Sequence, residues 1–320
     1  MRSKQVSLEG SAKLKARLAD GLSLECASNN SVRNEVKNLM CMSDDCESKE
    51  NGRRTFLTAA TASVLGLAAL NKSATARQQE KQPETRVLDD PRIQYGRVTF
   101  RHGGQETIDG YLARPKAEGV YPSVLVIAGN RITEEYIPNT CAALALAGFV
   151  GLAPNIFHLL PDSAKTPEEM RKALAQHTDL DVLEDIEAGA DYLRSQPFVK
   201  AGRMGVLGFC YGGRMAMLYG ARSREIEAVV PFHPGPVTPI EIARLKVPVQ
   251  VHCGTADRNV SVASIRKLEE MLRAQATPVE VFLYEKADHG FLAYTRPYYK
   301  PDAARLAWSR TIQFLTRALK

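Results

Sequence analysis

Residues 203–217, RMGVLGFCYGGRMAM, decide the fold of this chain. An apolar run over residues 204–209 leads directly into Cys210, and a helical pattern of apolar residues follows. The pattern predicts a strand, a sharp turn with a thiol at its apex, and a helix. Gly208 and Gly212 complete the GxSxG spacing of a nucleophile elbow, with cysteine in place of serine.

The glycines on either side of Cys210 meet a steric need of such a turn. The turn is strained, so a Cβ at Gly208 or Gly212 would collide with neighbouring backbone. At the start of a helix the thiol also feels the positive end of the helix dipole, which favours the thiolate. The alternative is that Cys210 is one more buried cysteine, because free cysteines are among the most buried residues.

Composition narrows the class of protein. The chain has 320 residues, 44% of them hydrophobic and 24% charged, which is ordinary for a soluble globular protein. The net charge is +6. The basic residues form no stripe, and no patch in which they alternate with aromatic residues, so the sequence does not suggest nucleic-acid binding. Outside the first 76 residues only Cys141, Cys210 and Cys253 occur, without a CxxC pair. We therefore expect no disulfide framework and no metal site.

The first 76 residues are expected to be absent from the mature protein. Residues 1–52 are polar and poor in aromatics, so we interpret them as a disordered or wrongly assigned extension, with Met40 or Met42 as a more natural start. In residues 53–76 an arginine pair, a short apolar run and an AxA ending are typical of a cleavable twin-arginine export signal. A short surface helix is the alternative. The prediction is a periplasmic or secreted domain over residues 77–320.

Beyond residue 77, short apolar strands alternate with helical patterns. The predicted strands cover residues 93–101, 107–114, 123–128, 149–153, 204–209, 228–232, 247–253 and 279–284. The predicted helices cover residues 134–147, a segment opening at Thr166 with a capping box to Glu169, 180–195, 260–274 and 301–319. This order predicts an α/β fold, with a mostly parallel sheet covered by helices on both faces.

Two further chemical groups follow strands of this sheet. Asp257 in CGTADRNV follows the strand 247–253, and His289 in KADHGF follows the strand 279–284. Nucleophile, acid and histidine, each after a different strand, is the chain order of α/β-hydrolases. We expect His289 to act as the base toward the thiol of Cys210, and Asp257 to orient His289. Taken singly, Asp257 also fits a turn residue or helix cap, and His289 a satisfied loop histidine.

With these motifs in place, the sequence resembles the dienelactone hydrolase family, the cysteine branch of the α/β-hydrolases, over about residues 93–319. The GxCxGG, Asp and His motifs of that family are matched by Cys210 with its glycines, by Asp257 and by His289. Residues 128–131, AGNR, resemble the family's HENRG segment. The resemblance implies an α/β-hydrolase fold without a large lid domain and hydrolysis of esters or lactones without a cofactor.

The chain departs from the family at two positions. Many members carry a glutamate that takes part in activating the cysteine, and Gly129 stands at that position here. The glutamates at 134–135 lie further along the chain, and they can replace the family glutamate only if their loop folds back toward Cys210. An arginine that binds carboxylated lactones in one subset falls on Ala293. Arg131 and Arg296 are the candidates to bind an anionic group, although Arg131 fits a surface residue or structural ion pair equally well.

The fold also implies an oxyanion hole. Its expected donors are the backbone N–H groups of Tyr211 and of Asn130, which follows the third strand. His158, His233 and His252 also lie near strand ends. None has a second histidine or carboxylate at ligand spacing, so we expect each of them to pack in the core or in a loop.

Two functions follow from these residues. The first is a soluble, exported hydrolase of small-molecule esters or lactones. It is expected to be a monomer or small homo-oligomer that binds no nucleic acid and does not associate stably with membranes. In it Cys210 attacks the carbonyl and water releases the acyl-thioester. The second is a catalytically degenerate scaffold that binds a ligand or senses oxidants through Cys210. A serine-type peptidase or lipase relative is disfavoured by the thiol and by the lack of a large inserted domain.

Overall fold

The computed structural model describes residues 86–102, 106–129, 135–158, 160, 167–174 and 176–320. The predicted extension over residues 1–52 and the predicted signal peptide over residues 53–76 lie outside these ranges.

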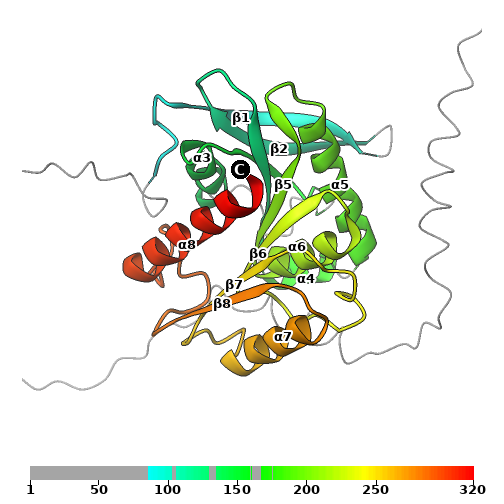
Figure 1. The fold of residues 1–320 in the computed structure, drawn as a ribbon, viewed down its shortest axis with the longest axis vertical. Coiled ribbons are helices and arrows are strands. Elements are labelled where there is room, and N and C mark those ends of the chain that lie inside the picture. Colours follow the sequence, from blue (N-terminus) through cyan, green and yellow to red (C-terminus); the bar gives the residue numbers. More distant parts are fainter. Residues whose placement is uncertain (1–85, 103–105, 130–134, 159, 161–166, 175) are drawn as a thin grey trace, which may run out of the picture. The chain divides into compact units, whose positions relative to one another are not determined.

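Eight strands form one sheet, which runs through the centre of Figure 1. The strands are β1 (Ile93–His102), β2 (Glu106–Pro115), β3 (Tyr121–Ile127), β4 (Val150–Pro154), β5 (Val199–Phe209), β6 (Ile226–Phe232), β7 (Val249–Gly254) and β8 (Val279–Tyr284). Their order across the sheet is β1-β2-β4-β3-β5-β6-β7-β8. β2 pairs antiparallel with β1 and β4, and every later pair is parallel. The prediction of a mostly parallel sheet is confirmed.

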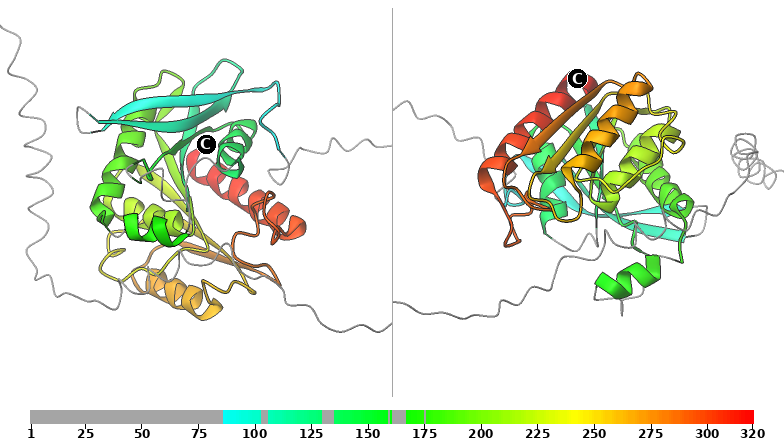
Figure 2. Two further views of the ribbon diagram at one scale, coloured as in Figure 1. Left: turned by 180° about the vertical axis from the view of Figure 1, so that it is seen from behind. Right: turned by 90° about the horizontal axis from the view of Figure 1, so that it is seen from below.

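Helices cover both faces of this sheet. They are α3 (Tyr136–Leu146), α4 (Pro167–Leu174), α5 (Asp179–Arg194), α6 (Tyr211–Arg222), α7 (Val262–Ala274) and α8 (Pro301–Leu319). α3 and α8 lie on one face and α5 and α6 on the other, while α7 packs on β7 and β8 (Figures 1 and 2). Strands β3, β4, β6 and β7 are almost entirely buried because they are covered on both sides.

Most predicted boundaries lie within two residues of the observed ones, and the start of β5 differs most. β5 begins at Val199, five residues before the predicted start, because its first half is largely exposed and lacks the apolar run. The predicted capping box at Thr166 lies outside the described residues. A capping box does form at the start of α5, where the Thr178 hydroxyl accepts from the Asp181 N–H and the Asp181 carboxylate accepts from the Thr178 N–H.

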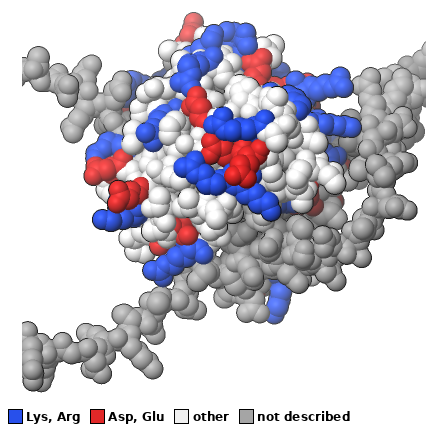
Figure 3. Space-filling view, turned by 60° about the horizontal axis from the view of Figure 1, so that its bottom comes forward, with Lys and Arg blue, Asp and Glu red and all other residues white. Residues whose placement is uncertain are grey.

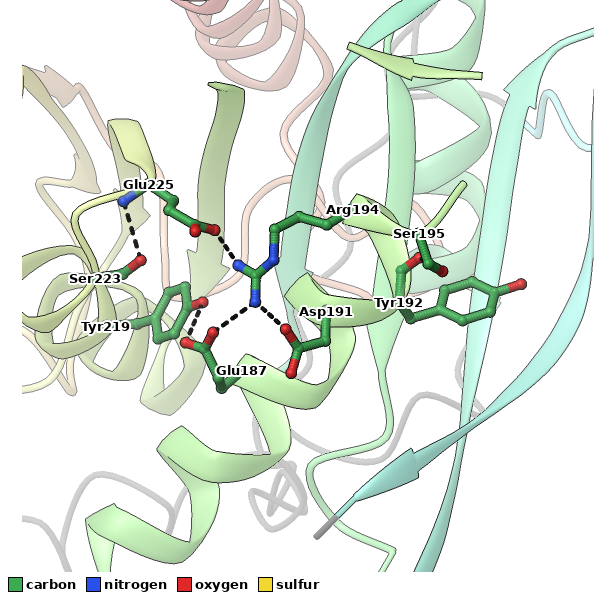
Figure 4. A network of polar contacts seen from close by, with 8 residues as sticks. All are labelled: Glu187, Asp191, Tyr192, Arg194, Ser195, Tyr219, Ser223 and Glu225. Atoms are coloured by element: carbon green, nitrogen blue, oxygen red, sulfur yellow. Dashed lines mark hydrogen bonds and ion pairs between the residues drawn. The ribbon is translucent and has the colours of Figure 1, made fainter. Parts of the chain in front are cut away.

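The end of α5 is tied to neighbouring elements by a charged network around Arg194 (Figure 4). Its guanidinium contacts the carboxylates of Glu187 and Asp191 on α5 and of Glu225, which directly precedes β6. Glu187 also accepts a hydrogen bond of 2.8 Å from the Tyr219 hydroxyl on α6. The network therefore joins α5, α6 and the start of β6.

The surface carries charge of both signs. On the face drawn in Figure 3, lysine and arginine side chains are interspersed with aspartate and glutamate, and uncharged surface lies around them. Among the described residues, no helix combines the length and the apolar character needed to cross a membrane.

Candidate active site

The candidate residues lie at one edge of the sheet because β5, β6, β7 and β8 run parallel. Cys210 follows β5, Asp257 lies in the loop after β7, and His289 lies in the loop after β8. The carboxyl ends of parallel strands meet at the same edge, which is where ligand sites form in such sheets. The topology thus brings all three side chains to one side of the molecule.

Cys210 occupies a strained turn between β5 and α6. Its φ of 53° and ψ of −116° lie outside the ordinary regions, and its N–H donates to the carbonyl of Phe232 at 3.0 Å. A Cβ at Gly208 would lie 2.1 Å from the carbonyl oxygen of Gly212. A Cβ at Gly212 would lie 2.2 Å from the carbonyl oxygen of Ile127. The predicted need for glycine at both positions is confirmed.

Asp257 is completely enclosed and held by its neighbours. Its Oδ1 accepts hydrogen bonds of 2.8 Å from the N–H groups of both Asn259 and Val260. Its Oδ2 lies 2.8 Å from Nδ1 of His289, and its side chain has no exposed surface. Three hydrogen bonds therefore fix this carboxylate with one oxygen directed at the histidine.

The loops after β7 and β8 are docked on each other by backbone hydrogen bonds. The Thr255 N–H donates to the Tyr284 carbonyl and the Ala256 N–H to the Ala287 carbonyl, both at 2.9 Å. A Cβ at Gly254 would lie 2.1 Å from the Ala287 carbonyl oxygen, so the approach depends on glycine. These backbone hydrogen bonds place Asp257 beside His289.

Burial and the neighbouring groups shift the pKa values of His289 and Asp257 in opposite directions. Burial opposes its positive charge, but the negative charge of Cys210 and the hydrogen bond with Asp257 outweigh burial and raise the pKa of His289 to about 10. For Asp257, burial opposes ionisation, but the hydrogen bond from His289 prevails and lowers the pKa of Asp257 below its usual value. The arrangement favours an imidazolium at His289 next to an ionised carboxylate at Asp257.

Cys210 differs from the other two described cysteines. Cys141 and Cys253 are buried, and burial raises the pKa of each thiol well above its usual range. Cys210 is partly exposed. Within the described ranges, no group of three or more His, Cys, Asp or Glu side chains is placed to hold a metal ion.

The predicted oxyanion donors and anion-binding residues are described only in part. Tyr211 is the first residue of α6, so its N–H has no partner within the helix. Asn130 and Arg131 lie outside the described residues. Arg296 is half-buried in the loop between His289 and α8. Ala293 is buried in the same loop.

Gly129 lies directly against the nucleophile turn. A Cβ there would lie 2.7 Å from the carbonyl oxygen of Phe209 and 3.1 Å from the Cβ of Cys210, so this position is closed to a side chain. Glu135 does not replace the missing carboxylate, because it accepts a hydrogen bond of 2.6 Å from the Tyr294 hydroxyl and lies 3.2 Å from Arg86. Neither Gly129 nor Glu135 therefore brings a carboxylate to the turn of Cys210.

Packing is predicted from the sequence for His158, His233 and His252, and it is confirmed for two of them. His252 is fully buried in β7 and contacts the Tyr284 hydroxyl at 2.8 Å. The ring of His158 lies 3.1 Å from the carboxylate of Asp185. His233 is also buried, but its ring centroid lies 4.3 Å from that of His289, which places it in the site. Sequence reasoning missed this contact, and its one available signal was that His233 directly follows a strand next to β5.

The chain is similar in sequence to proteins of one known family. The family model of the dienelactone hydrolase family matches residues 108–319. A candidate carboxymethylenebutenolidase from Synechocystis is 31% identical over 229 residues, which cover 67% of this chain and 93% of the relative. A candidate 2-oxo-3-(5-oxofuran-2-ylidene)propanoate lactonase from Bradyrhizobium is 32% identical over 218 residues, which cover 64% of this chain and 87% of the relative.

Solved structures share the fold. The crystal structure of a candidate dienelactone hydrolase from Klebsiella pneumoniae has a TM-score of 0.62 at 28% identity and covers 70% of this chain and 99% of its own. A dienelactone hydrolase-like promiscuous phosphotriesterase from metagenomic libraries has a TM-score of 0.62 at 20% identity over 71% of this chain and 99% of its own. The second likeness concerns the fold alone.

Proposed function

The chain belongs to the dienelactone hydrolase family, and from this premise we propose that it hydrolyses carboxylic esters or lactones with Cys210, His289 and Asp257. The observation that carries the proposal is the 2.8 Å contact of His289 Nδ1 with the enclosed carboxylate of Asp257, beside the strained turn of Cys210. A histidine oriented in this way by a carboxylate is the partner that a nucleophilic thiol needs.

The first half of the reaction forms an acyl-enzyme. The Cys210 thiolate attacks the carbonyl carbon, and the negative charge that develops on the carbonyl oxygen is stabilised by backbone N–H donors. Tyr211 is one expected donor and Asn130 the other; such donors contribute about 3–4 kcal/mol each in acyl-transfer enzymes. The tetrahedral intermediate expels the alcohol oxygen, which takes the proton from His289. The products are a thioester and an alcohol, or a ring-opened hydroxyl for a lactone.

The second half releases the acid. A water molecule gives a proton to neutral His289 and its oxygen attacks the thioester carbonyl. Collapse of the intermediate expels the Cys210 thiolate, which restores the thiolate and imidazolium pair. Asp257 keeps Nε2 of His289 directed at the reacting atoms in both halves.

The family glutamate has no counterpart at Gly129, and this supports a pair that is charged before substrate arrives. The position is closed to a side chain, and the pKa of His289, which Cys210 and Asp257 raise to about 10, keeps this histidine protonated beside the thiol. Cys210 is therefore available as a nucleophile without a substrate-driven switch.

Replacement of Cys210 tests the proposal directly. Cys210→Ala should abolish hydrolysis of a 4-nitrophenyl ester while the thermal unfolding midpoint changes little, and Cys141→Ala serves as the matched thiol control. Brief incubation of wild type with the ester should add one acyl group at Cys210, detected by mass spectrometry of peptides. Full esterase activity in the Cys210→Ala variant would refute the proposal.

The acyl-labelling experiment also tests the alternative function. The absence of the family glutamate at Gly129 is the observation that favours a scaffold which binds a ligand or senses oxidants. Acylation of Cys210 followed by hydrolysis supports the enzyme. Oxidation of Cys210 by peroxide without acylation by any ester supports the sensor.

The substrate class is proposed as a small ester or lactone. Ala293 supplies no charge at the position that binds the carboxylate of lactones in one family subset, so Arg131 and Arg296 are the proposed anion-binding residues. Paired esters and lactones with and without a carboxylate test this assignment. Arg131→Gln and Arg296→Gln should each raise KM for the carboxylated member of a pair and leave the uncharged member unchanged.

Export is proposed from residues 53–76. Arg53→Lys together with Arg54→Lys should retain the full-length chain in the cytoplasm, whereas the unaltered chain should reach the periplasm or medium in a shortened form. The measurement is immunoblotting of cell fractions. An unprocessed wild-type chain found only in the cytoplasm would contradict the proposal.

A further inference from the structure

His233 is placed at considerable cost directly after β6. Its side chain is buried with 3% exposure, and neither ring nitrogen has a hydrogen-bond partner in the structure described here. Its φ of 36° lies in the left-handed region and the next residue is a proline. Buried polar atoms without partners and left-handed backbone at a non-glycine residue are both unfavourable. An apolar residue would be a better packing residue at this position.

The backbone of His233 is held by a hydrogen bond to the neighbouring strand β7. The His233 N–H donates to the carbonyl of His252 on β7 at 2.6 Å. The preceding residue, Phe232, accepts from the N–H of Cys210 at 3.0 Å. His233 is thus fixed between the elements that carry the nucleophile and the acid.

The ring of His233 faces the ring of His289. The two centroids are 4.3 Å apart and the planes are inclined by 35°. His289 is otherwise faced by Asp257, by Cys210 and by Asp288, whose carboxylate binds the His289 N–H at 2.7 Å. Burial, and then the charge of His289, lower the pKa of His233 well below its usual value. His233 therefore stays neutral while His289 is positively charged.

A neutral aromatic ring over a cation is a favourable arrangement, and it strengthens when water is excluded. Because His233 is neutral and buried, its ring can stabilise the imidazolium of His289 in this way. The contact also limits rotation of the His289 ring about its bond to the backbone. Both effects depend on the aromatic face and neither depends on the ring nitrogens.

We propose that His233 is a positioning residue whose aromatic face holds the His289 ring in register with Cys210 and Asp257 and favours its imidazolium form. The proposal rests on the function proposed above, in which the pair of Cys210 and His289 is charged. It assigns to the residue after β6 a role in nucleophile activation.

The test compares four variants through the pH dependence of Cys210 alkylation by iodoacetamide, which needs no ester substrate. His233→Phe keeps an aromatic face and removes the nitrogens. His233→Leu keeps an apolar side chain without a π face. His233→Asn tolerates a left-handed φ but has no ring. His102→Leu, on β1 at the edge of the sheet, is the control for loss of a histidine.

We expect His233→Leu and His233→Asn to move the midpoint of the alkylation profile upward by about 0.5–1 pH unit, the size of a cation–π contact. Below the midpoint this is a roughly 3–10-fold slower reaction, with the plateau at high pH unchanged. His233→Phe and His102→Leu should keep the wild-type midpoint. Thermal unfolding of each variant shows that it is folded, and His233→Asn keeps the test available if His233→Leu does not fold.

Two outcomes would overturn the proposal. One is a wild-type midpoint in both folded ring-less variants, which would leave His233 with a packing role. The other is an alkylation midpoint in His233→Phe as high as that in His233→Leu. That result would show that the ring nitrogens of His233, and not its aromatic face, are needed. Failure of the proposed function looks different, because ester hydrolysis would then be absent in wild type while the alkylation profiles still differ among the variants.

Discussion

At the scale of single residues, the candidate site concentrates backbone strain. Cys210 and His233 both have left-handed φ, of 53° and 36°, and they follow the neighbouring strands β5 and β6. Non-glycine residues keep such conformations only where their surroundings determine them. Here the surroundings are the hydrogen bonds of both residues to adjacent strand ends. The strain presents a thiol and an aromatic face to the same histidine.

Asp257→Asn should lower kcat/KM by roughly 10²–10⁴-fold, because an amide does not stabilise an imidazolium and its NH₂ group favours the wrong tautomer of His289. The raised pKa of His289 should return toward its ordinary value. The measurement is the pH dependence of ester hydrolysis. Asp288→Asn is the matched control, since Asp288 bonds only the His289 N–H in the described structure. A variant with wild-type kcat/KM would contradict this role of Asp257.

Gly129→Glu should not introduce the family's glutamate as a working group. Its Cβ would lie 2.7 Å from the Phe209 carbonyl oxygen, so the turn of Cys210 must move. We expect a loss of about 1–3 kcal/mol in the free energy of unfolding, together with lower kcat. Urea unfolding and steady-state kinetics check both. An active variant of unchanged stability would show that the loop accepts a side chain.

At the scale of elements, the site depends on two docked loops. The loops after β7 and β8 exchange backbone hydrogen bonds at 2.9 Å, and these bonds set the distance between Asp257 and His289. The strands beneath them are paired in parallel and in register from Val249↔Val279 to Gly254↔Tyr284. Paired strands therefore hold the loops of the candidate site in place, as in other α/β folds.

Gly254→Ala should separate these loops, because its Cβ would lie 2.1 Å from the Ala287 carbonyl oxygen. We expect a loss of about 2–3 kcal/mol of stability and at least a roughly tenfold loss of kcat/KM. Gly96→Ala on β1 is the matched control, since its Cβ meets nothing within 4 Å. Equal behaviour of the two variants in urea unfolding and kinetics would contradict the prediction.

Arg194→Met should weaken the junction of α5 with α6 and β6. Arg194 contacts three carboxylates and is about one-third exposed, so we expect a loss of about 1 kcal/mol after solvent screening. Arg317→Met, which removes an exposed pair with Glu280, should cost less than about 0.5 kcal/mol. The midpoints of urea unfolding give both values. Kinetic constants should change in neither variant, since both arginines lie outside the candidate site.

At the scale of the whole molecule, the site couples stability to pH. The folded protein keeps the proton of His289 up to about pH 10, whereas an unperturbed histidine loses it near 6.5. The stability contributed by His289 is therefore complete below pH 6.5 and is lost as the pH rises through about 10. The difference in free energy of unfolding between wild type and His289→Gln should be larger at pH 6 than at pH 10. A difference that does not change with pH would contradict the coupling.

Much of the fold follows from local patterns in the chain. The apolar runs identify strands wherever both faces are covered, as in β3 and β6, and the pattern misses the first half of β5, which is largely exposed. The bounds of α8 are predicted without error because its amphipathic pattern starts at a proline and continues to Leu319. Exposed ends carry no such pattern, so their boundaries depend on pairing with a neighbouring strand.

By itself the sequence determined the strained turn, the glycines that permit it, and the order of Cys210, Asp257 and His289 along a parallel α/β sheet. These features rest on local sterics and on chain order. Only the tertiary structure decided that His233 lies on His289, that the position of Gly129 is closed, and that Glu135 is held by other partners. Each of these depends on the distance between strand ends that are remote in sequence, and that distance is set by sheet register and loop docking.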